Sequence, residues 1–222
     1  MTTVRALTPA VLEVDLAMLD PPALAFEAGQ WVSVPFGPKT VRAYSIASTP
    51  ASPAALTLCA DVAPAGPGSR WFRGLTPGDE VAFKGPLGGF VFDRADRRRP
   101  LFVAEEVGIV PIRSILTDLA ETGFDRPATL VYCGRDPSWL LHDAELRERA
   151  RGTPGFAYHP VVATASGARP ESAAARLVDQ LVTGASDVVA YVAGGQATID
   201  RVREVLMAKG LERRAVKWER FW

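Results

Sequence analysis

The sequence predicts two domains of different architecture, a six-stranded antiparallel β-barrel over residues 1–97 and a parallel-sheet α/β domain over residues 98–222. Three observations lead to this prediction. Short apolar runs separated by Pro- and Gly-rich turns fill the first part of the chain. Strand-like and helix-like segments alternate after the charged stretch DRADRRRP. At 222 residues, the chain is also long enough for two small domains with separate cores.

The first domain is expected to consist of short strands, most of which alternate apolar and polar residues. Turn material such as PFGP, APAGPG and TPGDE separates them. Strands at this spacing are typical of a small closed barrel. The six predicted strands lie at residues 11–16, 30–36, 41–48, 55–62, 80–85 and 89–93.

The second domain is expected to alternate strands with amphipathic helices that each end at glycine. Such alternation is typical of a parallel sheet covered on both faces. The strands are predicted at residues 101–106, 128–134, 156–162, 188–194 and 215–221. The helices are predicted at 112–123, 171–184 and 198–210, with apolar faces formed by Ile112, Ile115, Leu116 and Leu119, by Leu177, Val178, Leu181 and Val182, and by Ile199, Val202 and Leu206.

Composition narrows the classes of partner. The 25 basic and 25 acidic residues are well mixed, which predicts no binding to nucleic acid or an anionic membrane. The run Arg97–Arg99 is interpreted as a solvated linker, with a docking patch for an acidic partner as the alternative. No apolar stretch approaches the length of a membrane span, and the N-terminal residues lack a signal-peptide pattern. We therefore expect a cytoplasmic protein without membrane insertion.

The cysteines and histidines predict no metal site. The sequence has two cysteines, Cys59 and Cys133. An iron–sulfur cluster held by thiolates needs four, so no such cluster is expected within this chain. They are expected to be buried, reduced thiols. His142 and His159 lie apart in the sequence and form no ligand or catalytic constellation.

Three fragments of the first domain are more specific than strand patterns require. Arg42-Ala43-Tyr44-Ser45 puts an arginine and an aromatic ring on one face of a strand, which suits a ligand with a diphosphate and a flat heterocycle. Gly66-Pro67-Gly68-Ser69 leads into a short helix. Gly85-Pro86-Leu87-Gly88-Gly89-Phe90 is a turn whose glycines permit close backbone approach.

In order and spacing, these fragments resemble the ferredoxin–NADP reductase-like flavoprotein family over essentially the whole chain. The resemblance implies a Greek-key flavin-binding barrel followed by a Rossmann-like nucleotide-binding domain. It implies that Arg42 binds the FAD pyrophosphate, that Tyr44 packs on the isoalloxazine, and that the Ser45 hydroxyl lies near flavin N5. Gly66 and Ser69 would donate to the pyrophosphate, and Ala43, Gly85 and Gly88 would complete the flavin site. Asp61 stands where relatives often carry a basic residue, which leaves FMN as the alternative to FAD.

The corresponding nicotinamide turn is modified in this chain. Gly108 and Pro111 match the family loop, but Glu105 and Glu106 stand where relatives carry glycine. Their carboxylates would repel a pyrophosphate, or point away from it, or accept hydrogen bonds from ribose hydroxyls or the nicotinamide amide. A fourth interpretation is that they are the solvated end of a strand. Whether the two glutamates abolish nicotinamide binding is left open at this point.

Further matches and one departure concern the same ligand. Ala193 replaces the family cysteine that lies near nicotinamide C4, whereas Gly194 is kept. Gly134 and Arg135 resemble the family segment that contacts the adenosine end. Arg135 would contact a 2′-phosphate, whereas Asp136 would accept from a free 2′-hydroxyl, so the choice between NADH and NADPH is open.

The resemblance also implies roles for the last residues. Glu219 would relay a proton towards flavin N5, and Trp222 would cover the flavin until nicotinamide displaces it. The alternative is that the terminal aromatic residues complete the core of the last strand.

We expect an NAD(P)H-dependent FAD oxidoreductase that passes hydride to the flavin and electrons to a separate acceptor. Candidate acceptors are a ferredoxin, a Rieske-type component or a quinone. The first alternative is a flavin-binding electron-transfer subunit or sensor with a degenerate nicotinamide site. The second alternative is a scaffold protein that has lost both ligands. The presence of Arg42, Tyr44 and Ser45 argues against this alternative.

Overall fold

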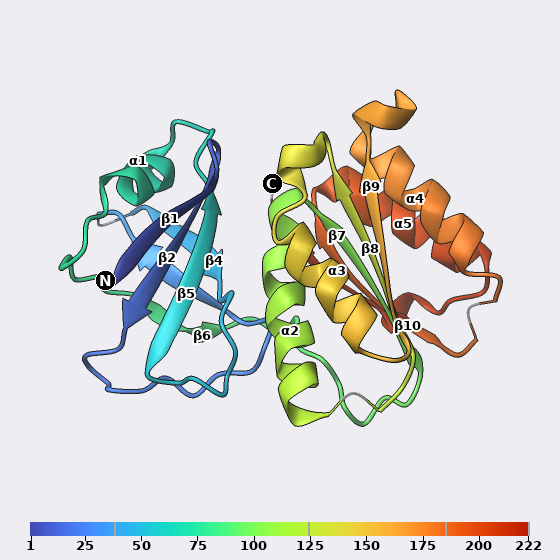
Figure 1. The fold of residues 1–222 in the computed structure, drawn as a ribbon, viewed down its shortest axis with the longest axis horizontal. Helices are drawn as coiled ribbons and strands as arrows, with labels where there is room; N and C mark the ends of the chain where they lie inside the picture. The colour runs from blue at the N-terminus through green and yellow to red at the C-terminus, as the bar shows by residue number, and fades with distance from the viewer. Residues whose placement is uncertain (38, 124, 185, 222) are drawn as a thin grey trace. The chain divides into compact units, whose positions relative to one another are not determined.

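The computed structural model describes residues 1–37, 39–123, 125–184 and 186–221, which divide into two compact units (Figure 1). Residues 1–92 and 113–123 form the first, which we call the barrel unit. Residues 93–112 and those described from 125 onwards form the second, which we call the sheet unit.

The barrel unit contains two three-stranded antiparallel sheets around one apolar core. One sheet has the order β1-β2-β5, with β1 at Thr3–Thr8, β2 at Val11–Ala17 and β5 at Ala55–Asp61. The other has the order β4-β3-β6, with β4 at Val41–Ser45, β3 at Trp31–Pro35 and β6 at Lys84–Leu87. A bridge between Ile46 and Leu58 links the sheets. Helix α1, Pro67–Gly74, follows β5 and contributes Phe72 to the core.

Six strands were expected in this unit, but two of the predicted positions are wrong. Residues 89–93 form no strand, and the segment expected at 80–85 is displaced to β6. The backbone at Phe90 packs instead on Gly29, where a Cβ atom would lie 2.0 Å from the Phe90 carbonyl oxygen. Strand β1 was missed because all six of its residues are exposed or half-buried, so it carries little apolar signal.

The sheet unit confirms the predicted parallel sheet strand by strand. The order is β11-β10-β7-β8-β9, and every neighbouring pair is parallel. The chain runs from β7 to β8 and β9 on one side, then returns to β10 and β11 on the other, so the topological switch point lies between β7 and β10. The strand bounds are β7 Arg99–Glu105, β8 Ala128–Gly134, β9 Phe156–Val162, β10 Val188–Gly194 and β11 Val216–Arg220.

Helices α4 and α5 pack against the sheet and against each other (Figure 1). Leu181 was expected on the buried face of α4 but is 38% exposed, whereas Ala173, Ala174 and Ala175 are buried there. Small alanines allow α4 and α5 to approach closely. The helices are α2 Ile109–Thr122, α3 Asp143–Gly152, α4 Pro170–Leu181 and α5 Gln196–Ala208, with short 3-10 turns η1 Glu106–Gly108, η2 Pro137–Trp139, η3 Thr164–Ser166 and η4 Arg213–Ala215.

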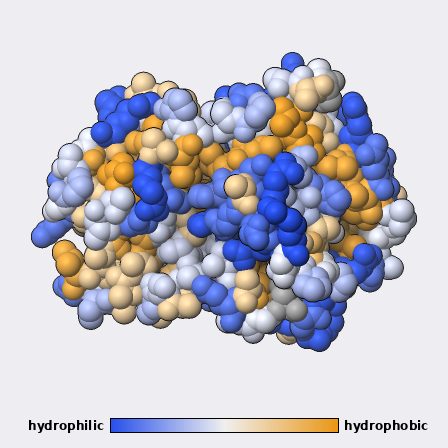
Figure 2. Space-filling model, viewed as in Figure 1, coloured by the Kyte–Doolittle hydropathy of each residue, from blue (hydrophilic) through white to orange (hydrophobic). Residues whose placement is uncertain are grey.

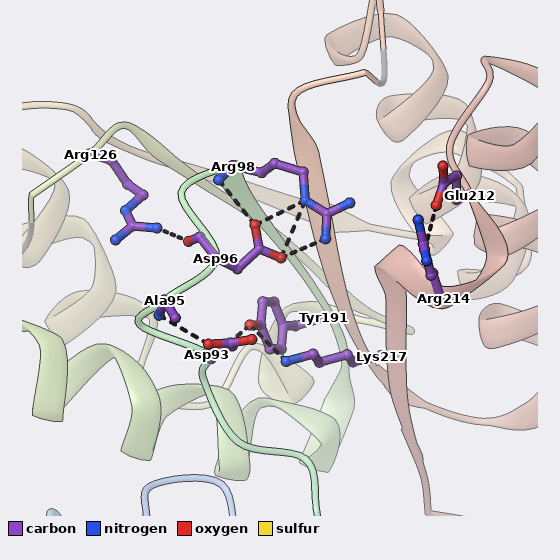
Figure 3. A network of polar contacts seen from close by, with 9 residues as sticks. All are labelled: Asp93, Ala95, Asp96, Arg98, Arg126, Tyr191, Glu212, Arg214 and Lys217. Atoms are coloured by element: carbon purple, nitrogen blue, oxygen red, sulfur yellow. Dashed lines mark hydrogen bonds and ion pairs between the residues drawn. The ribbon is translucent and has the colours of Figure 1, made fainter.

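The charged segment before β7 is held by ion pairs of the sheet unit (Figure 3). The Arg98 guanidinium donates to the Asp96 carboxylate at 2.5 and 2.9 Å, and Arg126 donates to the Asp96 carbonyl. The backbone N–H of Asp93 donates to the Tyr191 hydroxyl at 3.1 Å.

The flanking arginines are paired as well. Arg97 contacts Asp125 at 2.8 Å and Arg99 contacts Asp187 at 2.7 Å. The run is largely exposed, but each guanidinium faces a carboxylate. This pairing argues against the alternative of a docking patch for an acidic partner.

Hydrophilic and hydrophobic residues are interspersed over the face shown in Figure 2. Among the helices of the described residues, none has the length and apolar character needed to cross a bilayer.

Candidate functional site

Strand β4 carries the residues predicted to hold a flavin. Arg42 and Ala43 are exposed, whereas Tyr44 and Ser45 are 9% and 5% exposed. The Arg42 guanidinium donates a hydrogen bond to the Val41 carbonyl oxygen at 2.8 Å. Because a carbonyl is neutral, this contact does not neutralise the positive charge of Arg42. An exposed arginine held at a strand surface is suited to binding a phosphate.

Helix α1 packs directly on this strand. The Tyr44 ring lies 4.9 Å from the Phe72 ring and 5.9 Å from the Trp71 ring, measured between centroids. Burial raises the pKa of the Tyr44 hydroxyl to about 12. A Cβ atom at Gly68 would lie 2.4 Å from the Tyr44 hydroxyl and 3.4 Å from Cγ of Arg42. Gly68, which sequence reasoning did not single out, therefore brings the start of α1 against Arg42 and Tyr44.

The first turn of α1 faces this arginine without a side-chain cap. Gly66 is the N-cap residue with Pro67 next to it, and no side chain caps the helix. A Cβ atom at Gly66 would meet nothing within 4 Å, whereas Ser69 is buried. Backbone N–H groups in the first turn of a helix bind anions. Together with Arg42, this turn forms an arrangement that fits a diphosphate.

The glycines within and directly after β6 are required by the barrel itself. A Cβ atom at Gly88 would lie 2.5 Å from Nε1 of Trp31, and Gly88 has a φ of +96°. A Cβ atom at Gly85 would lie 2.9 Å from Cγ1 of Val32. The expected close backbone approach at these glycines is present, and β3 is the element approached.

In the sheet unit, Glu105 is the last residue of β7 and lies at the switch point. It is 7% exposed, and its Oε2 accepts from the backbone N–H of Gly195 at 2.8 Å. Gly195 is the N-cap residue of α5, so a carboxylate occupies the start of that helix. A Cβ atom at Gly194 would lie 2.7 Å from Cβ of Glu105. Burial raises the pKa of the Glu105 carboxyl above its usual range, and the Gly195 N–H opposes this rise.

Glu106 is bound by the arginine that was expected to contact the adenosine end. It is 3% exposed, and Arg135 pairs with both of its carboxylate oxygens, with Nε at 2.5 Å from Oε1. The Arg135 guanidinium also stacks 4.0 Å from the centroid of the Trp139 ring. The Tyr132 hydroxyl lies 3.0 Å from the Glu106 carbonyl oxygen and 2.9 Å from that of Trp139. The interpretation of the two glutamates as a solvated strand end is therefore wrong.

Backbone conformation indicates what Glu106 replaces. Its φ of +50° lies in the left-handed region, which glycine adopts at low cost and other residues adopt uncommonly. This positive φ is the geometry that the glycine expected from the family resemblance would adopt. Here the position carries a glutamate whose buried carboxylate pairs with Arg135.

The remaining predicted residues of the sheet unit pack the turns together. A Cβ atom at Gly108 would lie 2.2 Å from the Ala193 carbonyl oxygen, and one at Gly134 would lie 3.0 Å from the Asp136 carbonyl oxygen. Pro111 is buried in the first turn of α2, where proline is tolerated. The structure thus brings Gly108, Gly194 and both glutamates to the carboxyl ends of β7 and β10.

The two predicted catalytic residues belong to different units. Ser45 ends β4 in the barrel unit, and Glu219 is half-buried on β11, opposite Ala193 in the sheet register. Trp222 lies outside the described residues. Asp136 caps η2 by accepting from the Ser138 N–H at 2.9 Å.

Comparisons with known proteins agree with this architecture. Residues 5–92 match the family model of the oxidoreductase FAD-binding domain. Ferredoxin–NADP reductase B of Sorangium cellulosum is 33% identical over 161 residues, which cover 71% of this chain and 66% of that protein. Terephthalate 1,2-dioxygenase reductase component 1 of a Comamonas species is 29% identical over 189 residues, covering 84% of this chain and 56% of that protein.

Among solved structures, the Amycolatopsis cytochrome P450 reductase GcoB matches with a TM-score of 0.85 and 25% identity, covering 99% of this chain and 68% of that one. This chain belongs to the family of ferredoxin–NADP reductase-like, FAD- and NAD(P)-binding oxidoreductases. It spans 66% and 56% of the lengths of the two curated relatives named above.

Proposed function

We propose that this chain is a flavin-dependent reductase that passes hydride from NADH or NADPH to FAD and electrons to a separate acceptor. The observation that carries the proposal is the arrangement of exposed Arg42, the uncapped first turn of α1 and Gly68 at the Tyr44 hydroxyl. Bound FAD would accept two electrons as hydride and release them singly. Residues 1–97 would hold the flavin and residues 98–222 the nicotinamide dinucleotide.

In the barrel unit, each proposed role follows from placement. Arg42, together with N–H and hydroxyl donors of Gly66 and Ser69, binds the pyrophosphate, while the Tyr44 ring packs against the isoalloxazine. Ser45, almost fully buried at the end of β4, places its hydroxyl near N5. Gly85, within β6, packs against Val32, and Gly88, directly after it, packs against Trp31. Ala43 continues the strand surface beside the cofactor.

In the sheet unit, the proposed dinucleotide site lies at the carboxyl ends of β7 and β10. Gly108 and Pro111 position the turn into α2, and Gly134 and Arg135 position the turn after β8. Gly194 lies at the end of β10. Glu219, half-buried on β11, relays a proton towards the reacting end of the site.

The acceptor is proposed from the relatives' names and from the thiol count. Several similar proteins are named as reductase components of oxygenases, including the terephthalate 1,2-dioxygenase component. With two cysteines, the sequence given supplies too few thiolates for an iron–sulfur cluster. We therefore propose a ferredoxin, Rieske-type protein or small-molecule acceptor that is separate from these residues, in the cytoplasm.

One observation favours a second candidate function. The Glu105 carboxylate already lies at the switch point and accepts a hydrogen bond from the Gly195 N–H. Without Glu105, that N–H would be available to a ligand. In this alternative, the chain binds flavin but receives its electrons from a protein partner, as an electron-transfer subunit or sensor.

Anaerobic reduction of the FAD-reconstituted protein separates the two. Excess NADH or NADPH should bleach the visible flavin absorbance as fully as dithionite does. Bleaching by dithionite alone would contradict the reductase and leave the electron-transfer subunit. Failure to bind FAD would contradict both.

A further inference from the structure

The turn after β8 contains the residues that would distinguish a 2′-phosphate from a 2′-hydroxyl. In Rossmann-type sheets, a residue beyond the second strand contacts the adenosine ribose, where an acidic residue accepts from the hydroxyl and an arginine accommodates the phosphate. Here Arg135 and Asp136 stand next to each other at that place, so residue types alone do not decide the preference.

Glu106 alters the chemistry of this arginine. Nε and Nη2 of Arg135 each donate a hydrogen bond to a different oxygen of the Glu106 carboxylate. This edge of the guanidinium, which could otherwise bind two oxygens of a phosphate, is therefore occupied by Glu106. The guanidinium carbon also lies 4.0 Å from the centroid of the Trp139 ring, which is a cation–π contact. Contacts on two different elements, η1 and η2, thus hold the guanidinium in place.

The Arg135 guanidinium keeps this orientation because the Glu106 carboxylate has little access to water. Glu106 is 3% exposed, whereas the Arg135 side chain is 52% exposed. A buried carboxylate that loses its cation is strongly destabilised, so Glu106 retains Arg135 in competition with any phosphate. The Tyr132 hydroxyl beside the Glu106 carbonyl secures the same turn.

The local charge follows from three residues. Glu106 and Arg135 neutralise each other, and Asp136 adds a negative charge on the following residue. A 2′-phosphate placed here would meet two carboxylates and one committed guanidinium. A 2′-hydroxyl carries no charge to be repelled. It can donate a hydrogen bond to Oδ2 of Asp136, whereas Oδ1 already accepts from the Ser138 N–H and hydroxyl.

We propose that Glu106 is a specificity-determining residue: by holding Arg135, it selects the dinucleotide without a 2′-phosphate, NADH over NADPH. The proposal deepens the proposed function and rests on its nicotinamide dinucleotide site. Glu106 acts through Arg135 and is a positioning residue.

The test uses two nucleotide fragments, so that it is independent of hydride transfer. Adenosine 5′-monophosphate and adenosine 2′,5′-bisphosphate differ only in the 2′-phosphate, and calorimetric titration of the FAD-loaded protein gives a Kd for each. The native protein should bind the monophosphate more tightly than the bisphosphate. Equal affinity for the two fragments, a preference for the bisphosphate, or binding of neither fragment would overturn the proposal.

Substitution then isolates the residue. Glu106→Gln keeps the side-chain shape but removes its charge, and should shift the affinity ratio towards the bisphosphate by roughly 10- to 100-fold, the value of a hydrogen bond to a charged group. The double variant Glu106→Gln, Arg135→Gln should lose that shift. Glu148→Gln, an exposed glutamate paired with Arg151 on α3, is the matched control and should leave the ratio unchanged.

An unaltered ratio in folded Glu106→Gln protein would overturn the proposal. Should that variant fail to fold, the native ratio alone still decides the proposal. Lack of flavin reduction by either nucleotide, with the fragment ratios as expected, would contradict the reductase but not the selection by Glu106.

Discussion

Two arginines with similar predicted roles differ in what already binds them. Arg42 in the barrel unit is exposed and donates to a backbone carbonyl of its own neighbour, Val41. Arg135 in the sheet unit pairs with both oxygens of a buried glutamate and stacks on an indole. The first keeps its charge for a ligand, whereas the second uses its charge within the fold. An arginine at the position of a phosphate site therefore predicts phosphate binding only when no carboxylate of the fold already pairs with it.

The same contrast extends to the surrounding glycines. In the barrel unit, Gly68 makes room for a tyrosine hydroxyl, which is the end of a side chain. In the sheet unit, Gly108 makes room for the backbone carbonyl of Ala193. The turns of the sheet unit are thus fixed by backbone packing and buried charges before any ligand binds.

The largest expected effect is on stability and concerns the arginines themselves. Arg135→Gln leaves Glu106 buried without its cation and should lower the free energy of unfolding by about 3 kcal/mol. Arg42→Gln removes an exposed charge and should change it by less than about 0.5 kcal/mol in the flavin-free protein. Urea unfolding of both variants measures the difference. Equal losses of unfolding free energy in the two variants would show that Arg135 is no more tightly bound within the fold than Arg42 is.

A second effect tests the backbone contact at Gly108. A Cβ atom there would lie 2.2 Å from a carbonyl oxygen, so Gly108→Ala should cost about 2 kcal/mol or more, because tight packing cannot accept an added methyl group. Gly152→Ala at the end of α3 is the control, because a Cβ atom added there would meet nothing within 4 Å. It should be neutral or slightly stabilising, since alanine favours the helix. Similar unfolding midpoints for the two variants would show that the turn adjusts freely.

The third effect concerns flavin affinity. Arg42→Gln should weaken FAD binding by roughly 10- to 100-fold, because it removes charge-assisted hydrogen bonds to the pyrophosphate. Arg201→Gln, an exposed arginine paired with Glu204 on α5, should have no effect. Fluorescence titration of the apoprotein with FAD gives both values. Native affinity in Arg42→Gln would remove this residue from the flavin site.

The smallest effect is the pH dependence contributed by Glu105. Its pKa is raised in the folded state, so the folded protein holds this proton more tightly than the unfolded chain does. Its contribution is therefore greatest below the ordinary value of 4.5 and is lost as the pH rises through the folded-state pKa. Compared with Glu105→Gln, the native protein should lose stability from pH 4.5 upwards and then level off. A difference that stays constant with pH, or grows in favour of the native protein, would contradict this assignment.

Much of the fold was predictable because the signals are local. The three central strands of the sheet unit, β7, β8 and β10, are apolar runs buried between covered faces, and such runs are visible in the sequence. Strand β1 carries no such run, since half of its side chains are exposed. The segment at 89–93 has the residues of a strand but packs its backbone on Gly29, which a local pattern does not reveal.

The modified turn was located from sequence, but its side chains were not placed. Glu105 accepts from a backbone group 90 residues away, and Glu106 pairs with an arginine 29 residues away. Such partners depend on the strand order of the finished sheet, because β7 lies between β10 and β8. A glutamate at the end of a strand is usually solvated, and burial with its own partner reverses the expectation.

Rapid-mixing measurement of flavin reduction by NADH and by NADPH, in the native protein and in Glu106→Gln, tests selection through Arg135 most sharply. We expect a higher kcat/KM with NADH than with NADPH in the native protein, and a ratio of the two that falls by about tenfold or more in Glu106→Gln. A native protein that uses NADPH as well as NADH, or an unchanged ratio in the variant, would contradict the assignment of Arg135 to Glu106 as the basis of selection.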